Sequence, residues 1–288
     1  MQLNVITVDL EEWFVAEALS RRFPFEEWPN LTSTVVTNAR RLLRLFDRKD
    51  ARATWFVLGW VAEQHPELIG EINAAGHEIG CHSYRHTKVT DMTPEDFRRD
   101  TERALAAIHA AVGFRPTGYR APSWSIDSSI GWAFEILADL GFQYDSSIFP
   151  IKHDLYGMPD GPRQLFRMAL KDGGFLYEMP ASTIRILGRN LPVGGGGYLR
   201  HSPYWYSSSM IRKLNSLDRP AIVYIHPWET DPSSPRVKGL SAIQKFRTYG
   251  STSTLMAKLG RLLDEFEFAT MADYIKYVTR QKIGFERN

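Results

Sequence analysis

Short apolar runs alternate with longer amphipathic stretches along most of the chain. Residues 3–8 are typical of a buried strand, and residues 32–46 place Val35, Ala39 and Phe46 on one helical face with arginines opposite. The same alternation predicts strands at residues 53–58, 77–81, 118–121, near 143, 176–179 and 221–225, and helices at residues 61–75, 93–112, 129–140, 252–264 and 271–279. Repeated strand–helix units are typical of a parallel sheet with helical crossovers, and about seven of them favour a closed or nearly closed barrel. We therefore expect an α/β fold, a (β/α) barrel.

The chain has no internal repeat and no linker long enough to separate domains. We expect one domain over residues 1–288, with residues 150–206 as an insertion over one barrel face and residues 240–288 as a helical extension packed on the barrel. The insertion contains four consecutive glycines, residues 194–197. A flexible lid or a tight backbone crossing is favoured over a phosphate cradle there, because the lysine and the serine or threonine of a phosphate loop are missing.

The composition and the charge limit the classes of binding partner that we expect. The 288 residues include 35 Lys+Arg and 33 Asp+Glu, for a formal charge of +2, so nothing indicates nucleic acid or an anionic membrane as the main partner. The single cysteine, Cys81, cannot form an intrachain disulfide. Residues 1–9 lack a signal-peptide pattern, and no apolar run reaches the roughly 18 residues of a membrane span. We expect a cytoplasmic protein without an integral membrane segment.

Polar side chains gather directly after four of the predicted strands. In barrels of this kind, function gathers where the strands end at their carboxyl side, so these positions carry more weight than polar residues elsewhere. The four clusters are residues 9–12, 82–86, 120–124 and 226–229.

His82 and His86 are spaced so that both can bind one divalent ion, with a carboxylate as third ligand and water in the open position. The alternative is a pair of capping or hydrogen-bonded histidines. The acidic cluster at another strand end argues against this alternative. Asp9 and Glu11 lie two residues apart, and in an extended chain both point to one face. One can then bind the metal while the other stays free as a general base; the alternative is that these acids cap the following segment.

His226 follows the predicted strand at residues 221–225. An imidazole at this position can protonate a leaving group across the barrel mouth. A buried histidine bonded to the backbone is an equally good interpretation of this residue taken alone.

In this order, the clusters resemble the polysaccharide deacetylase family, the NodB-homology carbohydrate esterases, over residues 3–230. The matching motifs are two nearby acids after the first strand, a histidine-x-x-x-histidine motif, an arginine-proline-aromatic segment, a Tyr-Asp-Ser-Ser-Ile-Phe-Pro segment and a histidine strand end: residues 7–11, 82–86, 118–124, 144–150 and 225–227. The resemblance implies the distorted seven-stranded barrel of that family. It is greatest to a subgroup found with bacterial exopolysaccharide loci, through the Gly-Gly-Gly-Tyr segment ending at Tyr198 and the module at residues 240–280.

Carried over position by position, the resemblance implies a role for each matching residue. Asp9 would be the general base, held and tuned by Arg120, and His226 the general acid. Glu11, His82 and His86 would bind a divalent ion, zinc first, with Co²⁺, Ni²⁺, Fe²⁺ or Mn²⁺ as alternatives. The backbone N–H of Ser123 would stabilise the oxyanion. The candidates for substrate binding are Trp124, Asp145, Phe149, Tyr198 and Trp228.

Two departures from the family pattern leave questions open. Most of the family has two adjacent aspartates where this chain has Asp9-Leu10-Glu11-Glu12, so the ligand can be Glu11 or Glu12; the strand-face argument favours Glu11. Many relatives carry an aspartate that supports the catalytic histidine where this chain has Ile148. Glu229 is one candidate for orienting His226 instead.

The expected reaction is metal-assisted hydrolysis of an N-acetyl group on a sugar of a bacterial surface polysaccharide or exopolysaccharide, or on its lipid- or nucleotide-linked precursor. The expected partner is thus an N-acetylated sugar or polysaccharide. The alternatives are an amide hydrolase of a non-sugar substrate on the same fold and a glycan-binding protein that has lost turnover. The sequence leaves the sugar, the metal and the oligomeric state open.

Overall fold

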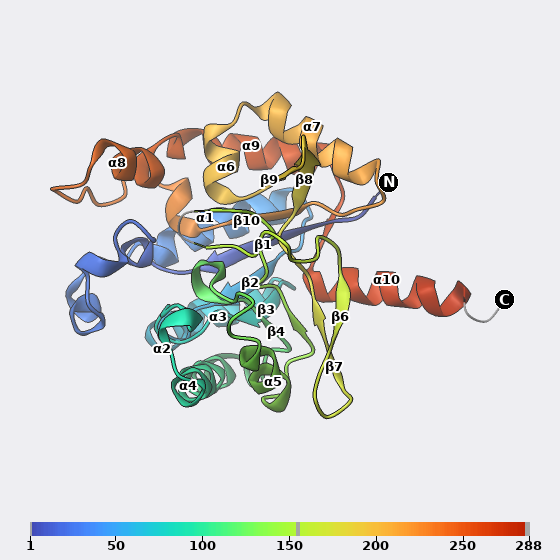
Figure 1. The fold of residues 1–288 in the computed structure, drawn as a ribbon. Coiled ribbons are helices and arrows are strands. Elements are labelled where there is room, and N and C mark those ends of the chain that lie inside the picture. Colours follow the sequence, from blue (N-terminus) through green and yellow to red (C-terminus); the bar gives the residue numbers. More distant parts are fainter. Residues whose placement is uncertain (1, 154–155, 286–288) are drawn as a thin grey trace.

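The computed structural model describes residues 2–153 and 156–285 (Figure 1). Within them, seven parallel strands lie side by side, and an antiparallel strand, β6 (Phe166–Ala169), follows the last of them. The seven, in spatial order, are β10 (Ile222–Ile225), β1 (Asn4–Leu10), β2 (Thr54–Val57), β3 (Glu78–Cys81), β4 (Gly118–Tyr119), β5 (Tyr144–Asp145) and β7 (Phe175–Glu178). No pairing among the described residues joins β6 to β10, so the curled sheet is an open, distorted barrel. The expected α/β barrel is confirmed.

The parallel strands are buried because helices cover the sheet. Every residue of β1 is buried, as expected for a strand inside a parallel sheet. Figure 1 shows α2 to α5 on one side of the sheet and α6, α7 and α9 on the other. The helices up to β5 are α1 (Val35–Arg48), α2 (Gly59–Gln64), α3 (Pro66–Ala74), α4 (Pro94–Val112) and α5 (Trp132–Asp139). Short 3-10 helices lie in the connections: η1 (Trp13–Val15), η2 (Ser20–Arg22), η3 (Phe25–Asn30), η4 (Val89–Asp91), η5 (Pro122–Trp124) and η6 (Pro227–Thr230).

The single helix predicted at residues 61–75 is wrong, because two helices, α2 and α3, meet at His65. Pro66 has no backbone N–H to donate, and its ring disfavours helical geometry at the residue before it. His65 accordingly adopts φ −136° and ψ 57°. Pro66 indicates this break in the sequence, but the apolar periodicity on both sides of it favours one continuous helix.

Residues 150–206 contain more regular structure than an insertion of loops. Beside β6 and β7 they include a hairpin of β8 (Thr183–Ile186) and β9 (Arg189–Pro192), then α6 (Gly196–His201) and the start of α7 (Tyr204–Asn215). The glycine run crosses tightly over β10: the Tyr224 N–H donates to the Gly194 carbonyl at 3.0 Å, and Gly195 bridges to Tyr224. A Cβ on Gly194 would lie 2.6 Å from the Ile222 carbonyl oxygen, so only glycine allows this approach.

The last part of the chain packs on both sides of the barrel. It consists of α8 (Ala242–Tyr249), α9 (Thr252–Glu265), β11 (Phe268–Ala269) and α10 (Met271–Phe285). β11 pairs with the beginning of β1, and the N–H groups that start α10 donate to Thr54 and Glu78 at the amino ends of β2 and β3. This end of the sheet lies opposite the strand ends that carry the polar clusters. None of the helices in the described residues has the length and apolar character needed to cross a membrane.

Candidate active site and metal centre

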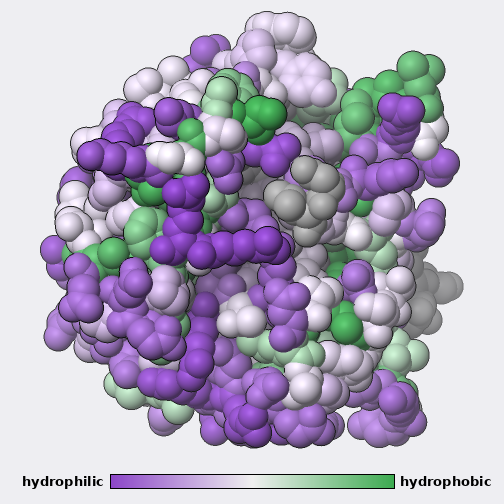
Figure 2. All heavy atoms as spheres, turned by 60° about the vertical axis from the view of Figure 1, so that its left-hand side comes forward, coloured by the Kyte–Doolittle hydropathy of each residue, from purple (hydrophilic) through white to green (hydrophobic). Residues whose placement is uncertain are grey.

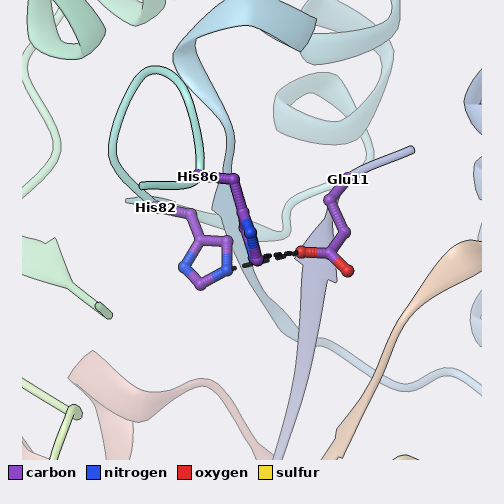
Figure 3. A group of neighbouring side chains, drawn as sticks. All are labelled: Glu11, His82 and His86. Atoms are coloured by element: carbon purple, nitrogen blue, oxygen red, sulfur yellow. Dashed lines mark ion pairs between the residues drawn. The ribbon is translucent and has the colours of Figure 1, made fainter. Parts of the chain in front are cut away.

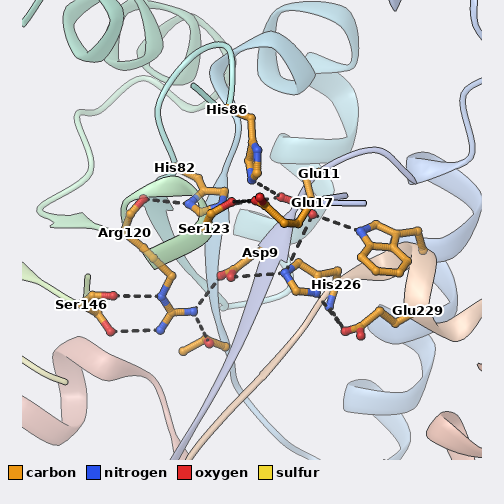
Figure 4. A network of polar contacts seen from close by, with 12 residues as sticks. Asp9, Glu11, Glu17, His82, His86, Arg120, Ser123, Ser146, His226 and Glu229 are labelled. Carbon is orange, nitrogen blue, oxygen red and sulfur yellow. Dashed lines mark hydrogen bonds and ion pairs between the residues drawn. The ribbon is translucent and has the colours of Figure 1, made fainter. Parts of the chain in front are cut away.

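Neighbouring strands bring the predicted clusters together at the carboxyl end of the sheet. The clusters follow β1, β3, β4 and β10, and β1 pairs directly with β10 although more than 200 residues separate them in sequence. Figure 2 shows the side of the molecule toward which β1 points; it is mostly hydrophilic and hollowed near its centre. The side chains lie close enough to act on one substrate group (Figure 4).

Glu11, His82 and His86 form a candidate metal site (Figure 3). Within the described part of the chain, theirs is the group of histidine and acidic side chains whose ligand atoms all lie within 4.8 Å of one another. The Glu11 Oε2 atom lies 2.8 Å from His86 Nε2 and 3.7 Å from His82 Nε2. Two imidazole nitrogens and one carboxylate oxygen are a ligand set for zinc or a neighbouring divalent transition ion.

Hydrogen bonds outside this group orient the ligand atoms. His82 Nδ1 lies 2.7 Å from the Arg120 carbonyl oxygen, which can only accept, so Nδ1 carries the proton and the Nε2 lone pair faces Glu11. The Trp228 indole N–H donates to Glu11 Oε1 at 3.0 Å. The buried Oε2 atom accepts no hydrogen bond from the described residues, so it can serve as a metal ligand. Burial opposes ionisation of Glu11, but His86, His226 and His82 outweigh it and hold its pKa well below the usual range.

Glu12 faces a different part of the molecule. Its carboxylate accepts hydrogen bonds from the Thr34 N–H at 3.1 Å and the Val35 N–H at 3.4 Å, and from the Ser33 hydroxyl. It thus satisfies free N–H groups at the start of α1. The structure places Glu11, not Glu12, beside the two histidines, as the strand-face argument predicts.

Asp9 is held by a buried arginine. Arg120 Nη1 donates to Asp9 Oδ1 and to the Thr7 hydroxyl, both at 2.7 Å, and the other guanidinium nitrogens donate to the carbonyl and hydroxyl oxygens of Ser146. The guanidinium also lies over the Phe56 ring, 4.2 Å from its centroid. Arg120 is fully buried and Asp9 nearly so. The pair therefore fixes the Asp9 carboxylate with Oδ1 occupied and Oδ2 on the side of His226.

His226 faces the acids from the neighbouring strand end. Its Nε2 atom lies 3.7 Å from Asp9 Oδ2 and 3.8 Å from Glu11 Oε1, and its Nδ1 atom lies 2.9 Å from Glu229 Oε2. Burial disfavours the charged imidazole, but the carboxylates of Glu11, Glu229 and Asp9 outweigh it and raise the pKa of His226 to about 9. Its side chain is 21% exposed, against 2–3% for Asp9 and Glu11, so it is the part of this group open to an incoming molecule.

Ser123 lies in a sharp turn after β4. Both it and Trp124 have left-handed backbone angles, φ 53° and φ 52°, and the Ser123 hydroxyl donates to Glu17 Oε2 at 2.7 Å. Non-glycine residues in this region are strained and persist where the surroundings fix them. The role of the Ser123 N–H in oxyanion binding stays a prediction.

The expected substrate-binding residues divide into two groups. Asp145 is fully buried and accepts hydrogen bonds from the N–H and hydroxyl of Ser147, and Phe149 is 1% exposed in an aromatic cluster with Trp124 and Tyr224. Contact of Asp145 and Phe149 with substrate stays a prediction. Asp145 supports the segment that carries Arg120, because the Ser147 hydroxyl donates to Asp145 and accepts the Ala121 N–H.

The second group lies nearer to the site. Trp124 and Trp228 are 6% and 8% exposed, and Tyr198 lies partly buried against the same aromatic cluster. The Trp228 ring is stacked on His226, with 5.3 Å between centroids. Contact of these rings with a sugar stays a prediction.

The sequence reasoning missed several residues that hold the site. Thr7 lies two residues before Asp9, so the strand alternation that places Asp9 and Glu11 on one face also predicts Thr7 on that face. Ser146, Glu17 and Arg200 have no such signal, because their contacts come from segments distant in sequence.

Two family models match the chain in succession. Residues 25–144 match the model described as Polysaccharide deacetylase, and residues 146–276 match a Domain of unknown function, DUF3473. The first segment contains His82, His86 and Arg120, and the second contains His226 and Glu229. Asp9 and Glu11 precede both.

Curated proteins with similar sequences are named as deacetylases. The peptidoglycan deacetylase of Helicobacter pylori is 36% identical over 108 residues, which are 38% of this chain and 36% of that protein. The peptidoglycan-N-acetylglucosamine deacetylase of Bacillus cereus is 27% identical over 112 residues, 38% of this chain and 39% of that protein. Chitin deacetylase 2 of Saccharomyces cerevisiae is 26% identical over 106 residues, 37% of this chain and 31% of that protein. The chain thus spans 31–39% of the length of these relatives.

The fold likeness extends over nearly the whole chain. A crystal structure from Mycobacterium smegmatis, described as a polysaccharide deacetylase, superposes with a TM-score of 0.63 at 21% identity, covering 98% of this chain and 92% of that one. This likeness shows the fold. Residues 25–144 thus resemble the polysaccharide deacetylase family, both by the family model and by the deacetylase sequences that match this part of the chain.

Proposed function

We propose that this chain is a metal-dependent hydrolase that removes N-acetyl groups from a sugar. The observation that carries the proposal is the convergence of a buried three-residue candidate metal site, an arginine-held carboxylate and a partly exposed histidine at one end of the sheet. Glycan-binding proteins have no need for this set, because binding a neutral sugar requires neither a metal ligand group nor an acid and a base on neighbouring strands.

Asp9 serves as the general base in this proposal. Its Oδ2 atom takes a proton from the attacking water while Arg120 keeps Oδ1 fixed at 2.7 Å. Because the carboxylate is buried and anchored, it does not need to reorganise when the water approaches. A divalent ion held by Glu11, His82 and His86, with zinc the first choice, supplies polarisation of the acetyl carbonyl and activation of water.

His226 serves as the general acid on the other side. Its Nε2 atom donates a proton to the departing amine nitrogen as the carbon–nitrogen bond breaks, and the oxygen of water ends on the acetyl carbon. The products are acetate and a sugar with a free amine. Of the two ring nitrogens, Nδ1 contacts Glu229, so Nε2 faces the reacting centre.

The substrate proposal rests on the relatives. Their names specify peptidoglycan, its N-acetylglucosamine and chitin, which have N-acetylated sugars in common. We propose such a sugar in a bacterial surface polysaccharide or exopolysaccharide, or in its lipid- or nucleotide-linked precursor. The exopolysaccharide assignment and the cytoplasmic location remain predictions, and cell fractionation tests the second.

The test is an acetate-release assay on zinc-loaded protein with N-acetylated oligosaccharides, peptidoglycan fragments and nucleotide-linked N-acetyl sugars, each with and without chelator. We expect acetate from at least one sugar class, and its loss in the chelated sample and in the Asp9→Asn variant. Asp139→Asn is the control, since Asp139 is an exposed aspartate on α5 whose carboxylate binds Arg98 on α4 and none of the site residues. Sugar binding without acetate release from any substrate, even with zinc or cobalt, would instead identify a binding protein, and turnover of non-sugar acetamides alone would identify an amide hydrolase.

A further inference from the structure

Glu229 holds His226 through one carboxylate oxygen. Its Oε2 atom accepts the backbone N–H of His226 at 3.0 Å and lies 2.9 Å from the ring Nδ1 of the same residue. Both contacts arise because Glu229 lies three residues after His226, within the single turn of η6. With the backbone and the ring of His226 bonded to one atom, the imidazole has little freedom to rotate.

Arg200 in turn holds Glu229 from the other side. Its Nε atom donates to Glu229 Oε1 at 2.9 Å, and both side chains are almost completely buried. The remaining guanidinium nitrogens donate to the carbonyl oxygens of Arg247, Thr248 and Gly250, where α8 ends and α9 is about to begin. Arg200 therefore spans from the end of α8 to the carboxylate beside His226.

The helix that carries Arg200 is itself fixed in place. Lys258 on α9 donates to the carbonyl oxygens of Leu199, Arg200 and Ser202 at the end of α6. The Arg200 guanidinium also lies 5.7 Å from the centroid of the Trp228 ring. This ring stacks on His226, and its indole N–H donates to Glu11. A buried guanidinium with partners on Nε, Nη1 and Nη2 is a strong constraint on the position of the carboxylate it binds.

We propose that Glu229 and Arg200 are positioning residues for His226: Glu229 fixes the ring with Nδ1–H toward its own carboxylate and Nε2 toward the reacting centre, and Arg200 fixes Glu229. The proposal deepens the proposed function and rests on it. It also gives the segment at residues 146–276 a role, because that segment supplies the acid together with the two side chains that orient it. Ile148 cannot perform this task, since its side chain carries no polar atom and is buried in the core.

A purely structural role is the competing explanation, since Glu229 also caps η6 through the His226 N–H. The two roles separate in the zinc-loaded Glu229→Gln variant, whose side-chain oxygen can still accept that N–H but carries no charge. If Glu229 positions the acid, kcat on the N-acetyl sugar falls by about 10²-fold. KM and the zinc content are unchanged, because Glu229 touches neither the metal ligands nor the open side of the site.

Substrates with different leaving groups provide the discriminating measurement. A departing amine needs a proton from His226, whereas the 4-nitrophenolate of 4-nitrophenyl acetate leaves without one. We expect Glu229→Gln to lose turnover of the amide and retain turnover of the ester. The ring ¹⁵N and ¹H spectrum of His226 gives a readout independent of activity: the Nδ1–H signal bonded to a carboxylate is present in the wild-type protein and absent in the variant.

Arg200→Lys tests the second half of the pair. A lysine keeps the charge but cannot reach Glu229 and the three carbonyl oxygens together. Amide turnover should therefore fall while ester turnover is retained, as in Glu229→Gln but by a smaller factor. Glu265→Gln and Arg219→Lys are the matched controls, because Glu265 binds Tyr204 and Arg212, and Arg219 binds the Arg163 carbonyl, all outside the network. Both controls should keep wild-type turnover of amide and ester.

Three results would overturn the proposal: unchanged amide turnover in Glu229→Gln, equal loss of amide and ester turnover, or an unchanged His226 spectrum. Failure of the proposed function has a different signature, namely a wild-type protein that releases no acetate from any N-acetyl sugar. In that case the His226 spectrum still decides whether Glu229 orients the ring.

Discussion

Replacing Gly196 and Gly197 one at a time by alanine tests how closely α6 is packed against the support of His226. Both glycines lie in α6 and are adjacent in sequence, and neither has a left-handed backbone angle. Their surroundings differ. A Cβ on Gly196 would lie 2.5 Å from Cδ of Glu229 and closer still to its Oε2 atom, whereas a Cβ on Gly197 would meet no heavy atom within 4 Å.

The expected magnitudes follow from this difference. Alanine at Gly197 removes the helix penalty of glycine and stabilises the fold by up to about 1 kcal/mol. Alanine at Gly196 gains the same but must displace a carboxylate held by Arg200 and by two contacts to His226. Overpacking a tight site costs about 1–3 kcal/mol, and a disturbed buried ion pair adds to that cost. We therefore expect Gly197→Ala to exceed Gly196→Ala by about 2–4 kcal/mol in free energy of unfolding.

Urea unfolding followed by circular dichroism measures this gap, and a thermal scan should show it as several degrees in Tm. Acetate release should fall in Gly196→Ala and stay at the wild-type level in Gly197→Ala. Equal stability of the two variants, or a more stable Gly196→Ala, would refute the close packing of α6 against Glu229.

Three further expectations concern the base, the metal and a buried histidine. Asp9→Asn should retain zinc and lose about 10²- to 10⁴-fold in turnover, measured by acetate release; full activity would remove Asp9 as the base. Adding zinc to metal-free protein should stabilise it by about 4 kcal/mol when the free zinc concentration is 1,000 times the dissociation constant, which a thermal scan shows as a higher Tm. His82→Ala should abolish this rise in Tm. Burial, with help from Arg52, lowers the pKa of His77 to about 4, and its Nδ1 accepts the Ala53 N–H. Because the folded pKa lies below the unfolded value of 6.5, about 3 kcal/mol of stability present above pH 6.5 should be lost between pH 6.5 and 4. Unfolding free energies against pH should lose this slope in His77→Phe, and an unchanged slope would contradict the assignment.

The sequence indicated the parallel sheet and most of the site because both depend on local patterns. Apolar runs that end in polar residues mark strand ends, and strand alternation places Asp9 and Glu11 on one face. The predicted helix start at residue 93 agrees with Thr93, whose hydroxyl accepts the Asp96 N–H at the start of α4. These signals lie within a few residues of the atoms they position.

Features that depend on distant packing were not accessible in the same way. Arg200 has no local pattern that points to Glu229, because the two meet only when α6 folds over η6. The β8–β9 hairpin turns at Leu187 and Gly188, both with positive φ, and leucine is an unusual residue for such a turn. The burial of Asp145 and Phe149 likewise depends on β7 and the aromatic cluster rather than on their own neighbours in sequence.

Sheet register explains how the two matched segments make one site. Val8 pairs with Ile225, so the residues that follow, Asp9 and His226, leave adjacent strands at the same level. Asp9 Oδ2 and His226 Nε2 lie 3.7 Å apart. A slip of one residue between β1 and β10 would turn one of the two side chains to the opposite face of the sheet and separate base from acid. The packing that fixes this register, from the Gly194 crossing over β10 to the pairing of β11 with β1, comes from the second segment and the residues around it. The segment of unknown function is therefore part of the geometry of the candidate site and not an accessory to a barrel that is complete without it.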